Sequence, residues 1–142
     1  MLKILVPVDG SPNAERALSH AIQYAGNSKQ AVELHLLNVQ LPIVSGDVKM
    51  FISQQDINDY YRDKAEEVLA PARRTLDAAG VKYATHIGVG QPAETIVAHQ
   101  VDKQCDQIIM GSRGLGAVSG LVMGSVARKV VHLANVPVTL VK

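Results

Sequence analysis

The stretch QIIMGSRGLGAVSGLVMGSVARKVV, residues 107–131, decides the fold, because an apolar run, a glycine-rich loop and a helical pattern follow one another in it. Gln107–Met110 is predicted to form a buried strand, and Val126–Val131 begins a predicted helix. Between them lie five of the chain's eleven glycines, and glycine lets the backbone approach a ligand closely. The helix adds unpaired N–H groups and the positive end of its dipole. This order of elements predicts a binding site for phosphate.

The spacing within the loop separates it from two common nucleotide-binding motifs. No lysine follows Gly124, as a Walker A loop requires, and the later glycines do not fit the dinucleotide fingerprint. The loop instead reads Gly111-x-x-Gly114, nine residues, and then Gly124-Ser125. This spacing resembles that of the universal stress protein family, in its ATP-binding branch.

Three other segments carry the same resemblance, which covers essentially the whole chain. They are Ile4–Ser11 (ILVPVDGS), Leu36–Val39 (LLNV) and Val136–Val141 (VPVTLV). The resemblance implies one universal stress protein domain over residues 1–142. It also implies an α/β fold, Rossmann-like and adenine nucleotide alpha hydrolase-like, with an open five-stranded parallel sheet in the order 3-2-1-4-5 and helices on both faces.

The alternation of strand and helix patterns along the chain independently favours a parallel sheet covered by helices on both faces. Strands are predicted at Lys3–Val8, Val32–Val39, Lys82–Val89, Gln107–Met110 and from a turn at 135–137 through Val141. Helices are predicted after the N-cap Ser11 as far as Gly26, from Ser53 to Gly80 with a kink at Pro71, from Pro92 with Ile96, Val97 and Val101 facing inward, and over Val126–Ala134. The segment Gln40–Ile52 has no clear period, and its role is left open.

Length and composition narrow the class of protein. A chain of 142 residues fits one domain, and a formal net charge of +1 creates no field that would recruit nucleic acid or an anionic membrane. No apolar run approaches the ~20 residues of a membrane span, and the N-terminus does not resemble a signal peptide. Cys105 is the only cysteine, which excludes an internal disulfide. We therefore expect a cytoplasmic protein.

Two separate motifs are expected to meet at one crevice. In the implied strand order the direction of winding reverses between the first and fourth strands. Ligands of open α/β sheets bind at such a point, beyond the carboxyl ends of the strands. Asp9 ends the first predicted strand and Gly111 ends the fourth, so both are expected there.

The residues before the first helix and at the end of the second strand each have two interpretations. Asp9 could accept hydrogen bonds from a ribose or bind Mg²⁺, or it could simply satisfy local N–H groups at the start of a helix. Beside the glycine loop, ligand contact is favoured. Pro7 and Val8 could form an apolar wall for a base, or only pack in the core. The family resemblance implies that the backbone of Val39 pairs with an adenine edge; its residue type alone indicates only the end of a buried strand.

The loop supplies the other predicted contacts. Gly111, Gly114 and Gly124 are positions where the backbone could approach phosphate, and Ser125 is predicted to be both a helix N-cap and a phosphate ligand, or a cap alone. Gly116 and Gly120 could serve only to keep the loop flexible. The complete predicted nucleotide-binding set is Pro7, Val8, Asp9, Val39, Met110, Gly111, Arg113, Gly114, Gly124, Ser125 and Val126.

The charged and reactive side chains have smaller predicted roles than the loop backbone. Arg113 and Arg128 could add charge-assisted contacts to phosphate, although Arg128 and Lys129 more often belong to a solvated helix face. The five histidines, at positions 20, 35, 86, 99 and 132, show no metal-ligand spacing, so structural or surface roles are expected. Cys105 adjoins Asp106, which does not favour a thiolate, and is predicted to be inert. No catalytic constellation and no protein metal cluster are predicted.

The favoured function is a regulatory stress-response protein that binds ATP or another adenine nucleotide, with Mg²⁺ accompanying it near Asp9 and Ser125. A slow ATP hydrolase or phosphotransferase is an alternative, although a Walker lysine, an arginine finger and an evident general base are missing. A nucleotide-free interaction module is a third, which the intact glycine set disfavours. A regulatory protein partner is left open.

The last strand predicts a homodimer. Val136–Val141 would form an apolar edge of the sheet, and such an edge invites pairing unless it is covered. The same strand of a second copy can run antiparallel to it across a two-fold axis. The family resemblance points the same way.

Overall fold

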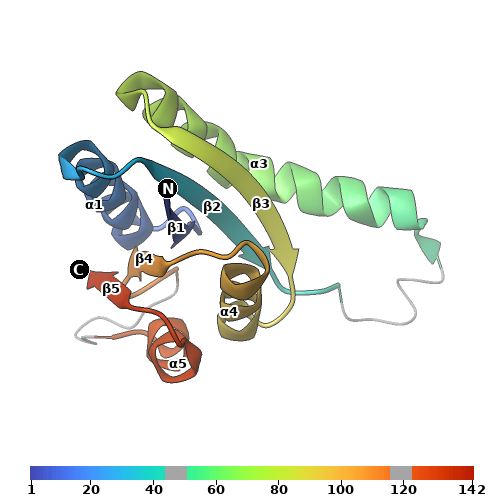
Figure 1. Ribbon diagram of the computed structural model, residues 1–142. Coiled ribbons are helices and arrows are strands. Elements are labelled where there is room, and N and C mark those ends of the chain that lie inside the picture. The colour runs from blue at the N-terminus through green and yellow to red at the C-terminus, as the bar shows by residue number, and fades with distance from the viewer. Residues whose placement is uncertain (44–50, 116–122) are drawn as a thin grey trace.

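The computed structural model describes residues 1–43, 51–115 and 123–142. Within these residues five parallel strands form one sheet in the order β3-β2-β1-β4-β5, which confirms the predicted order (Figure 1). The strands are β1 Leu2–Pro7, β2 Val32–Gln40, β3 Lys82–Val89, β4 Gln107–Gly111 and β5 Val138–Val141. The predicted strands therefore agree with the observed ones to within a few residues at each end.

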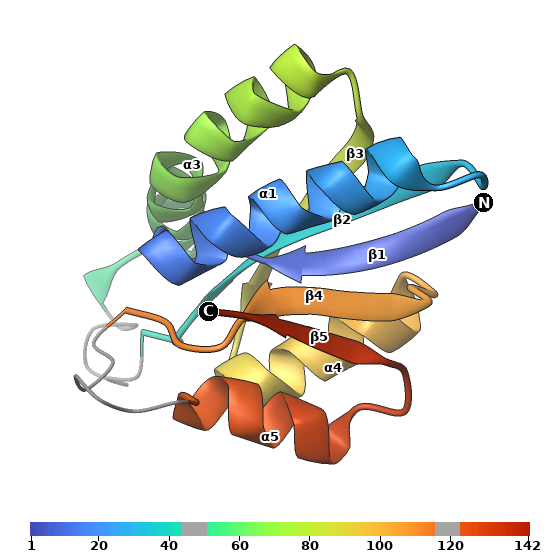
Figure 2. The ribbon, with the colours of Figure 1, turned by 90° about the vertical axis from the view of Figure 1, so that its left-hand side faces the viewer.

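Helices cover both faces of the sheet, as the alternating pattern predicts. They are α1 Pro12–Asn27, α3 Gln54–Ala79, α4 Pro92–Asp102 and α5 Ser125–Leu133. Figure 2 shows α1 and α3 on one side of the strands and α4 and α5 on the other. Among the described residues no helix is both long and apolar enough to cross a bilayer.

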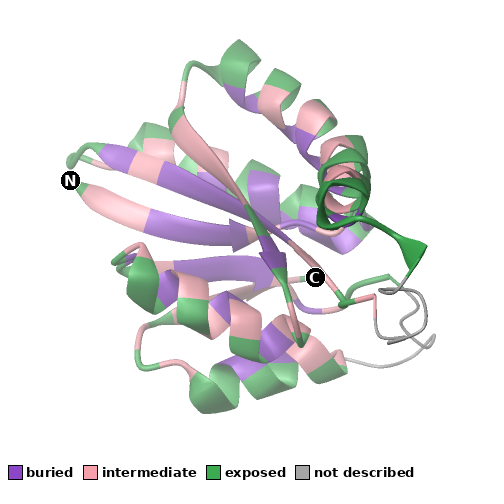
Figure 3. Ribbon diagram, turned by 90° about the vertical axis from the view of Figure 1, so that its right-hand side faces the viewer, coloured by how far each residue is buried: buried purple, intermediate pink, exposed green. Residues whose placement is uncertain are grey.

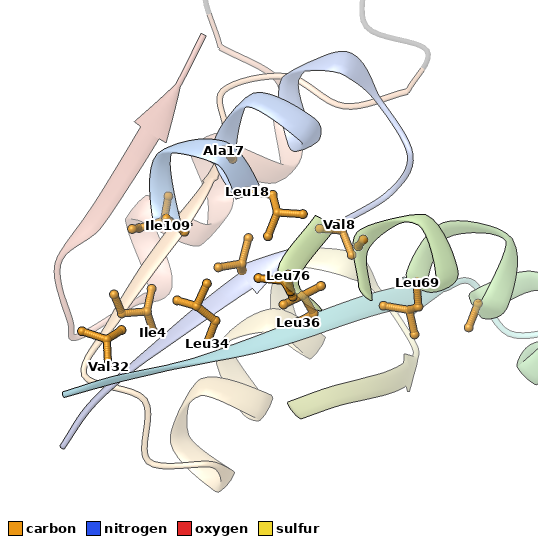
Figure 4. Packing of buried hydrophobic residues seen from close by; sticks show 14 residues of the cluster. Ile4, Val8, Ala17, Leu18, Val32, Leu34, Leu36, Leu69, Leu76 and Ile109 are labelled. Carbon is orange, nitrogen blue, oxygen red and sulfur yellow. The ribbon is translucent and has the colours of Figure 1, made fainter. Parts of the chain in front are cut away.

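Side chains that alternate along the strands pack into two separate hydrophobic cores, one on each face of the sheet. Ile4 and Val6 of β1 join Leu34 and Leu36 of β2 under α1 and α3, where Leu76 is fully buried (Figure 4). The intervening residues point the other way and pack beneath α4 and α5 in a second cluster. That cluster contains Leu5, Leu37, Ala93, Ile96, Cys105, Ile108, Met110, Ala127 and Val130. Figure 3 shows the consequence, since the inner strands are the most deeply buried part of the fold.

Several helix boundaries follow the predicted chemistry. The side-chain oxygen of Ser11 accepts a hydrogen bond from the Ala14 N–H at 3.2 Å, and that of Ser53 accepts one from Asp56 N–H at 3.1 Å. Gly80 ends α3 in the left-handed conformation at φ 68°, which glycine adopts without strain. The helix continues through Pro71, and the kink predicted there stays a prediction.

Two predictions about helices are wrong. Gly26 does not stop α1, which ends one residue later before an extended Ser28, so no left-handed residue is needed there. Val101 does not face the core: its exposed fraction is 64%, and Gln100 is buried in its place. The reason is a hydrogen bond of 2.8 Å from Gln100 Nε2 to the Cys105 carbonyl, which satisfies the buried amide.

Some predictions fall outside the described residues. These are the flexible-loop role of Gly116 and Gly120, and residues 44–50 within the segment Gln40–Ile52.

Candidate functional site

A cavity of about 450 Å³ opens beyond the carboxyl ends of β1, β2 and β4. The chain leaves β1 toward α1 on one face of the sheet and leaves β4 toward α5 on the other, so the two connections diverge and leave a crevice. All eleven residues of the predicted nucleotide-binding set lie in its wall. Residues that the sequence analysis missed complete the lining: Ala14, Leu37, Pro92, Ile96, Leu115 and Ala127.

The N-terminus of α5 forms the most polar part of the wall. Its first intrahelical hydrogen bond runs from Arg128 N–H to the Gly124 carbonyl at 3.0 Å, so the N–H groups of Ser125, Val126 and Ala127 precede the hydrogen-bond ladder. All three residues line the cavity, and the first turn contains no acidic side chain. The helix therefore presents to the cavity N–H donors that no described residue accepts, together with the positive end of its dipole.

The predicted capping role of Ser125 is wrong. Gly124 is the N-cap, with extended backbone at φ −76° and ψ 164°, and no side chain within the described part of the chain caps the helix. The Gly124 N–H is held by the Ser112 carbonyl at 2.7 Å, which places the helix start one residue earlier than expected. As the first residue of the helix, Ser125 still lines the cavity.

Asp9 joins the turn after β1 to the loop after β4. Its Oδ1 accepts a hydrogen bond from Ser11 N–H at 2.9 Å, and its Oδ2 accepts one from Leu115 N–H at 3.1 Å. A Cβ atom on Gly114 would lie 2.6 Å from Oδ2, so a side chain at that position would push the Asp9 carboxylate out of this place. The carboxylate thus satisfies local N–H groups while it also lines the cavity, and each oxygen keeps a second lone pair for a ligand.

The three predicted glycines do not share one role. At Gly111 a Cβ atom would lie 2.9 Å from the Asn13 Cβ, so the missing side chain lets α1 pack closely on β4. At Gly124 the nearest heavy atoms to a Cβ atom are 3.4 Å away or more, which is close to ordinary van der Waals contact. Gly111 is therefore explained by packing, whereas Gly124 has no comparable neighbour within the described residues.

Buried Asn13 holds the elements around this glycine together, and the sequence analysis missed it. Its Nδ2 lies 3.3 Å from Ser112 Oγ and 3.4 Å from the Val141 carbonyl, at the ends of β4 and β5. An asparagine in the first turn of a helix gives no sequence signal for such a contact, because its partners lie 99 and 128 residues away along the chain.

The opposite wall suits a flat apolar ring with a hydrogen-bonding edge. The Leu37 carbonyl accepts a hydrogen bond of 2.9 Å from Val8 N–H at the end of β1. Val39 lies two residues further along β2, so its own N–H and C=O point in the same direction, past the end of β1. Pro7, Val8 and Met110 line the cavity beside it.

The charges near the cavity fall into two groups. Among the described lining residues, Arg113 is the basic one and Asp9 the acidic one. Arg128 and Lys129 are exposed on the outer face of α5 and do not line the cavity, and Lys129 forms an ion pair with Glu94. The solvated interpretation of both residues is confirmed.

Three histidines that looked unrelated in the sequence form a row between the sheet and α4. His35 Nδ1 lies 2.8 Å from His86 Nε2, and His35 Nε2 lies 2.7 Å from Glu33 Oε1. The His99 ring of α4 is 6.5 Å from that of His86. Burial lowers the pKa of His86 to about 4, with a further contribution from His35. His86 is therefore neutral near pH 7, which agrees with a structural role.

Metal and thiol chemistry find no support in the described part of the chain. No cluster of three or more histidine, cysteine or acidic side chains among residues 1–43, 51–115 and 123–142 could hold a metal ion. Burial raises the pKa of the Cys105 thiol to about 11, which agrees with its predicted inertness.

Known proteins share this fold. The model of the universal stress protein family matches residues 1–142. The solved structure of hypothetical protein MJ0577, a protein of Methanocaldococcus jannaschii, superposes with a TM-score of 0.85 at 33% identity, over 99% of this chain and 95% of that one.

Two similar solved structures contain adenine nucleotides. The universal stress protein of Archaeoglobus fulgidus in complex with dAMP is 27% identical, with a TM-score of 0.71, over 100% of this chain and 98% of that one. A family protein of Arabidopsis thaliana with AMP bound is 25% identical, with a TM-score of 0.68, over 100% and 92%. With its sheet order, its cavity and the match over its full length, the chain belongs to the universal stress protein family.

Proposed function

We propose that this chain is a regulatory stress-response protein that binds an adenine nucleotide, with ATP the expected ligand, in the cavity beyond β1 and β4. The observation that carries the proposal is the pairing of two walls. One presents the N-terminus of α5, whose first N–H groups precede the helical hydrogen-bond ladder, and the other combines apolar side chains with the outward backbone of Val39. The dAMP and AMP complexes of related proteins support the same class of ligand.

Each part of a nucleotide has a counterpart in this wall. The phosphates would lie at the N–H groups of Ser125 and its two successors, with Arg113 adding charge. The adenine would lie against Val8 and Met110, with its edge at the Val39 backbone. The ribose would lie near Asp9, and a Mg²⁺ ion accompanying ATP would find its oxygen ligands at Asp9 and Ser125.

A binding role fits this wall better than a catalytic one. Both carboxylate oxygens of Asp9 already accept backbone hydrogen bonds, and Asp9 is the acidic residue among the described lining residues. Phosphoryl transfer needs groups that orient the attacking nucleophile and stabilise the developing charge. We therefore expect slow ATP hydrolysis at most, and a turnover assay with radiolabelled ATP measures it.

Calorimetry with purified protein tests the proposal. ATP, ADP, AMP and cyclic AMP are titrated in the presence and absence of Mg²⁺, with GTP as the matched control for the base. We expect binding of the adenine series and at least tenfold weaker binding of GTP, because the Val39 backbone reads a base edge. Equal affinity for ATP and GTP, or no binding of any adenine nucleotide, contradicts the proposal. Mass spectrometry of ligand released on denaturation checks for nucleotide that copurifies.

We also propose that the protein acts as a homodimer through Val136–Val141. β5 stands at one end of the sheet and pairs with β4 along one side. Since the Pro137 and Val141 carbonyls accept from β4, the N–H and C=O groups of Val138 and Leu140 point away from β4. A second copy could pair with that outward row across a two-fold axis.

A further inference from the structure

A second cavity, of about 430 Å³, lies between α1 and α3 on the face of the sheet opposite α4 and α5. Its floor and sides are mostly apolar. We name it the α1–α3 groove, and its lining consists of Val8, Gly10, Ala14, Glu15, Leu18, Ser19, Glu67, Val68, Pro71, Ala72 and Thr75. Val8 and Ala14 also line the first cavity, so the two cavities lie back to back.

The charge of the groove has one sign. Its charged lining residues among those described are Glu15 on α1 and Glu67 on α3, and both are exposed. The neighbouring Arg16 forms no ion pair with either glutamate among the described residues, and its guanidinium donates instead to the Lys142 carbonyl at 2.7 Å and to Asn13 Oδ1 at 2.8 Å. Lys64 lies 4.0 Å from Glu67, a distance at which an exposed ion pair contributes little. The groove is therefore a negative site with apolar walls.

Proline adds a further hydrogen-bond acceptor at the same place. Pro71 lies inside α3 and has no N–H, so the carbonyl oxygen of Glu67, four residues earlier, loses its α-helical donor. Glu67 and Pro71 both line the groove. The carboxylates on the two helices and this carbonyl all accept hydrogen bonds, so a ligand that supplies N–H donors and positive charge complements them.

We propose that the α1–α3 groove binds a basic segment of a partner protein. An apolar side chain of that segment would pack against Leu18, Val68 and Ala72, and a neighbouring lysine or arginine would lie between Glu15 and Glu67. Apolar contact with a groove between helices gives such a segment its affinity, and the opposite charges select it over acidic segments. The proposal does not depend on nucleotide binding, because Glu15 and Glu67 do not line the first cavity.

Selection from a phage library of random dodecapeptides on the full-length chain tests this. We expect the selected peptides to combine leucine, isoleucine or phenylalanine with lysine or arginine. Their binding should weaken with added salt. NMR titration with a synthetic copy of a selected peptide should shift the resonances of Leu18, Val68 and Ala72, which line this groove alone. A selection that yields no basic peptide, or shifts confined to another surface, overturns the proposal.

Two pairs of variants separate the groove from general charge and surface effects. Glu15→Gln with Glu67→Gln should weaken peptide binding about five- to tenfold, whereas Asp56→Asn with Asp63→Asn removes equal charge elsewhere on α3 and should leave it within about twofold. Ser19→Trp puts bulk at the exposed rim and should abolish binding, whereas His20→Trp, next to it on α1 and outside the groove, should not. Equal effects within either pair overturn the assignment.

Discussion

Gly111 and Gly114 show that single residues in one loop can be glycine for different reasons. Gly111 makes room for α1, and Gly114 makes room for the carboxylate of Asp9. Gly124 could accept a Cβ atom without a close contact to the described residues. The reason for glycine there is therefore either the approach of a ligand or the path of the chain into α5. The three glycines look equivalent in the sequence motif. Substituting each one should nevertheless show which affects the stability of the fold and which affects only nucleotide affinity.

Gly114→Val should weaken ATP binding at least tenfold, about 1.4 kcal/mol, because its Cβ atom displaces Asp9 and its side chain enters the cavity. Gly124→Val should weaken binding similarly with little change in stability. Calorimetry measures affinity, and thermal melting checks the fold. Gly26→Ala is the matched control, since a Cβ atom there meets nothing within 4 Å. Unchanged affinity in a folded double Gly114→Val and Gly124→Val variant contradicts the site.

Asp9→Ala should weaken binding of ATP more than that of deoxy-ATP if the carboxylate accepts hydrogen bonds from the ribose. The lost charged hydrogen bond costs roughly 1.5–3 kcal/mol. Asp9 also holds Leu115 N–H, so some loss is common to both nucleotides. The ratio of the two affinities, measured in parallel titrations, isolates the ribose contribution. Equal losses for both nucleotides would assign Asp9 to Mg²⁺ or to the loop alone.

At the scale of elements, the pairing of β2 with β3 brings the histidine row together. Leu37 is the register partner of His86, which places His86 beside His35 on the face covered by α4. Glu33 accepts from His35 at the other end of the row. Although burial alone would raise the pKa of Glu33, hydrogen bonds from His35 and Lys82 lower it below its usual value. His35 thus lies between a neutral His86 at one side and a charged Glu33 at the other.

The row predicts a loss of stability in mild acid. The pKa of His86 is about 4 in the fold against 6.5 for the free side chain. The unfolded chain therefore takes up a proton first, and stability falls as pH drops from about 6.5 toward 4. His35, Lys103 and His99 add to the lowering of the pKa of His86, whereas Asp102 acts to raise it.

His86→Gln removes the titrating group and keeps a hydrogen-bonding side chain beside His35. We expect the wild-type free energy of unfolding to fall by about 1–3 kcal/mol more than that of the variant between pH 6.5 and 4. Urea unfolding at a series of pH values measures this difference. His20→Gln, on the exposed side of α1, serves as the control. Parallel pH profiles for wild type and His86→Gln would refute the assignment.

At the scale of the whole molecule, the outward row of β5 determines the expected assembly. Val138→Pro removes an N–H donor that points away from β4, so the sheet within one chain should survive while the proposed pairing between copies is lost. Light scattering at micromolar concentration should show a dimer for the wild type and a monomer for the variant. A folded Val138→Pro protein that remains a dimer places the interface elsewhere, with Gln40–Ile52 the next candidate.

The sequence by itself determined the strands, their alternation with helices and the positions of the predicted site. Each strand is a local apolar run, and the helix starts at Ser11 and Ser53 use short-range hydrogen bonds, so neighbouring residues carry that information. The strand order and the adenine interpretation of Val39 came from the family resemblance. All eleven predicted residues met at one cavity because parallel strands end at the same edge of a sheet.

Tertiary structure alone decided which side chains complete that cavity and which polar groups pair. The contact of Asp9 with Leu115 spans 106 residues, that of Asn13 with Ser112 spans 99, and that of His35 with His86 spans 51. The α1–α3 groove likewise depends on how two helices pack on one face. Such contacts depend on sheet register and helix packing. Residue type and local spacing do not reveal them, because each of these polar side chains could equally well be hydrated in its own isolated segment.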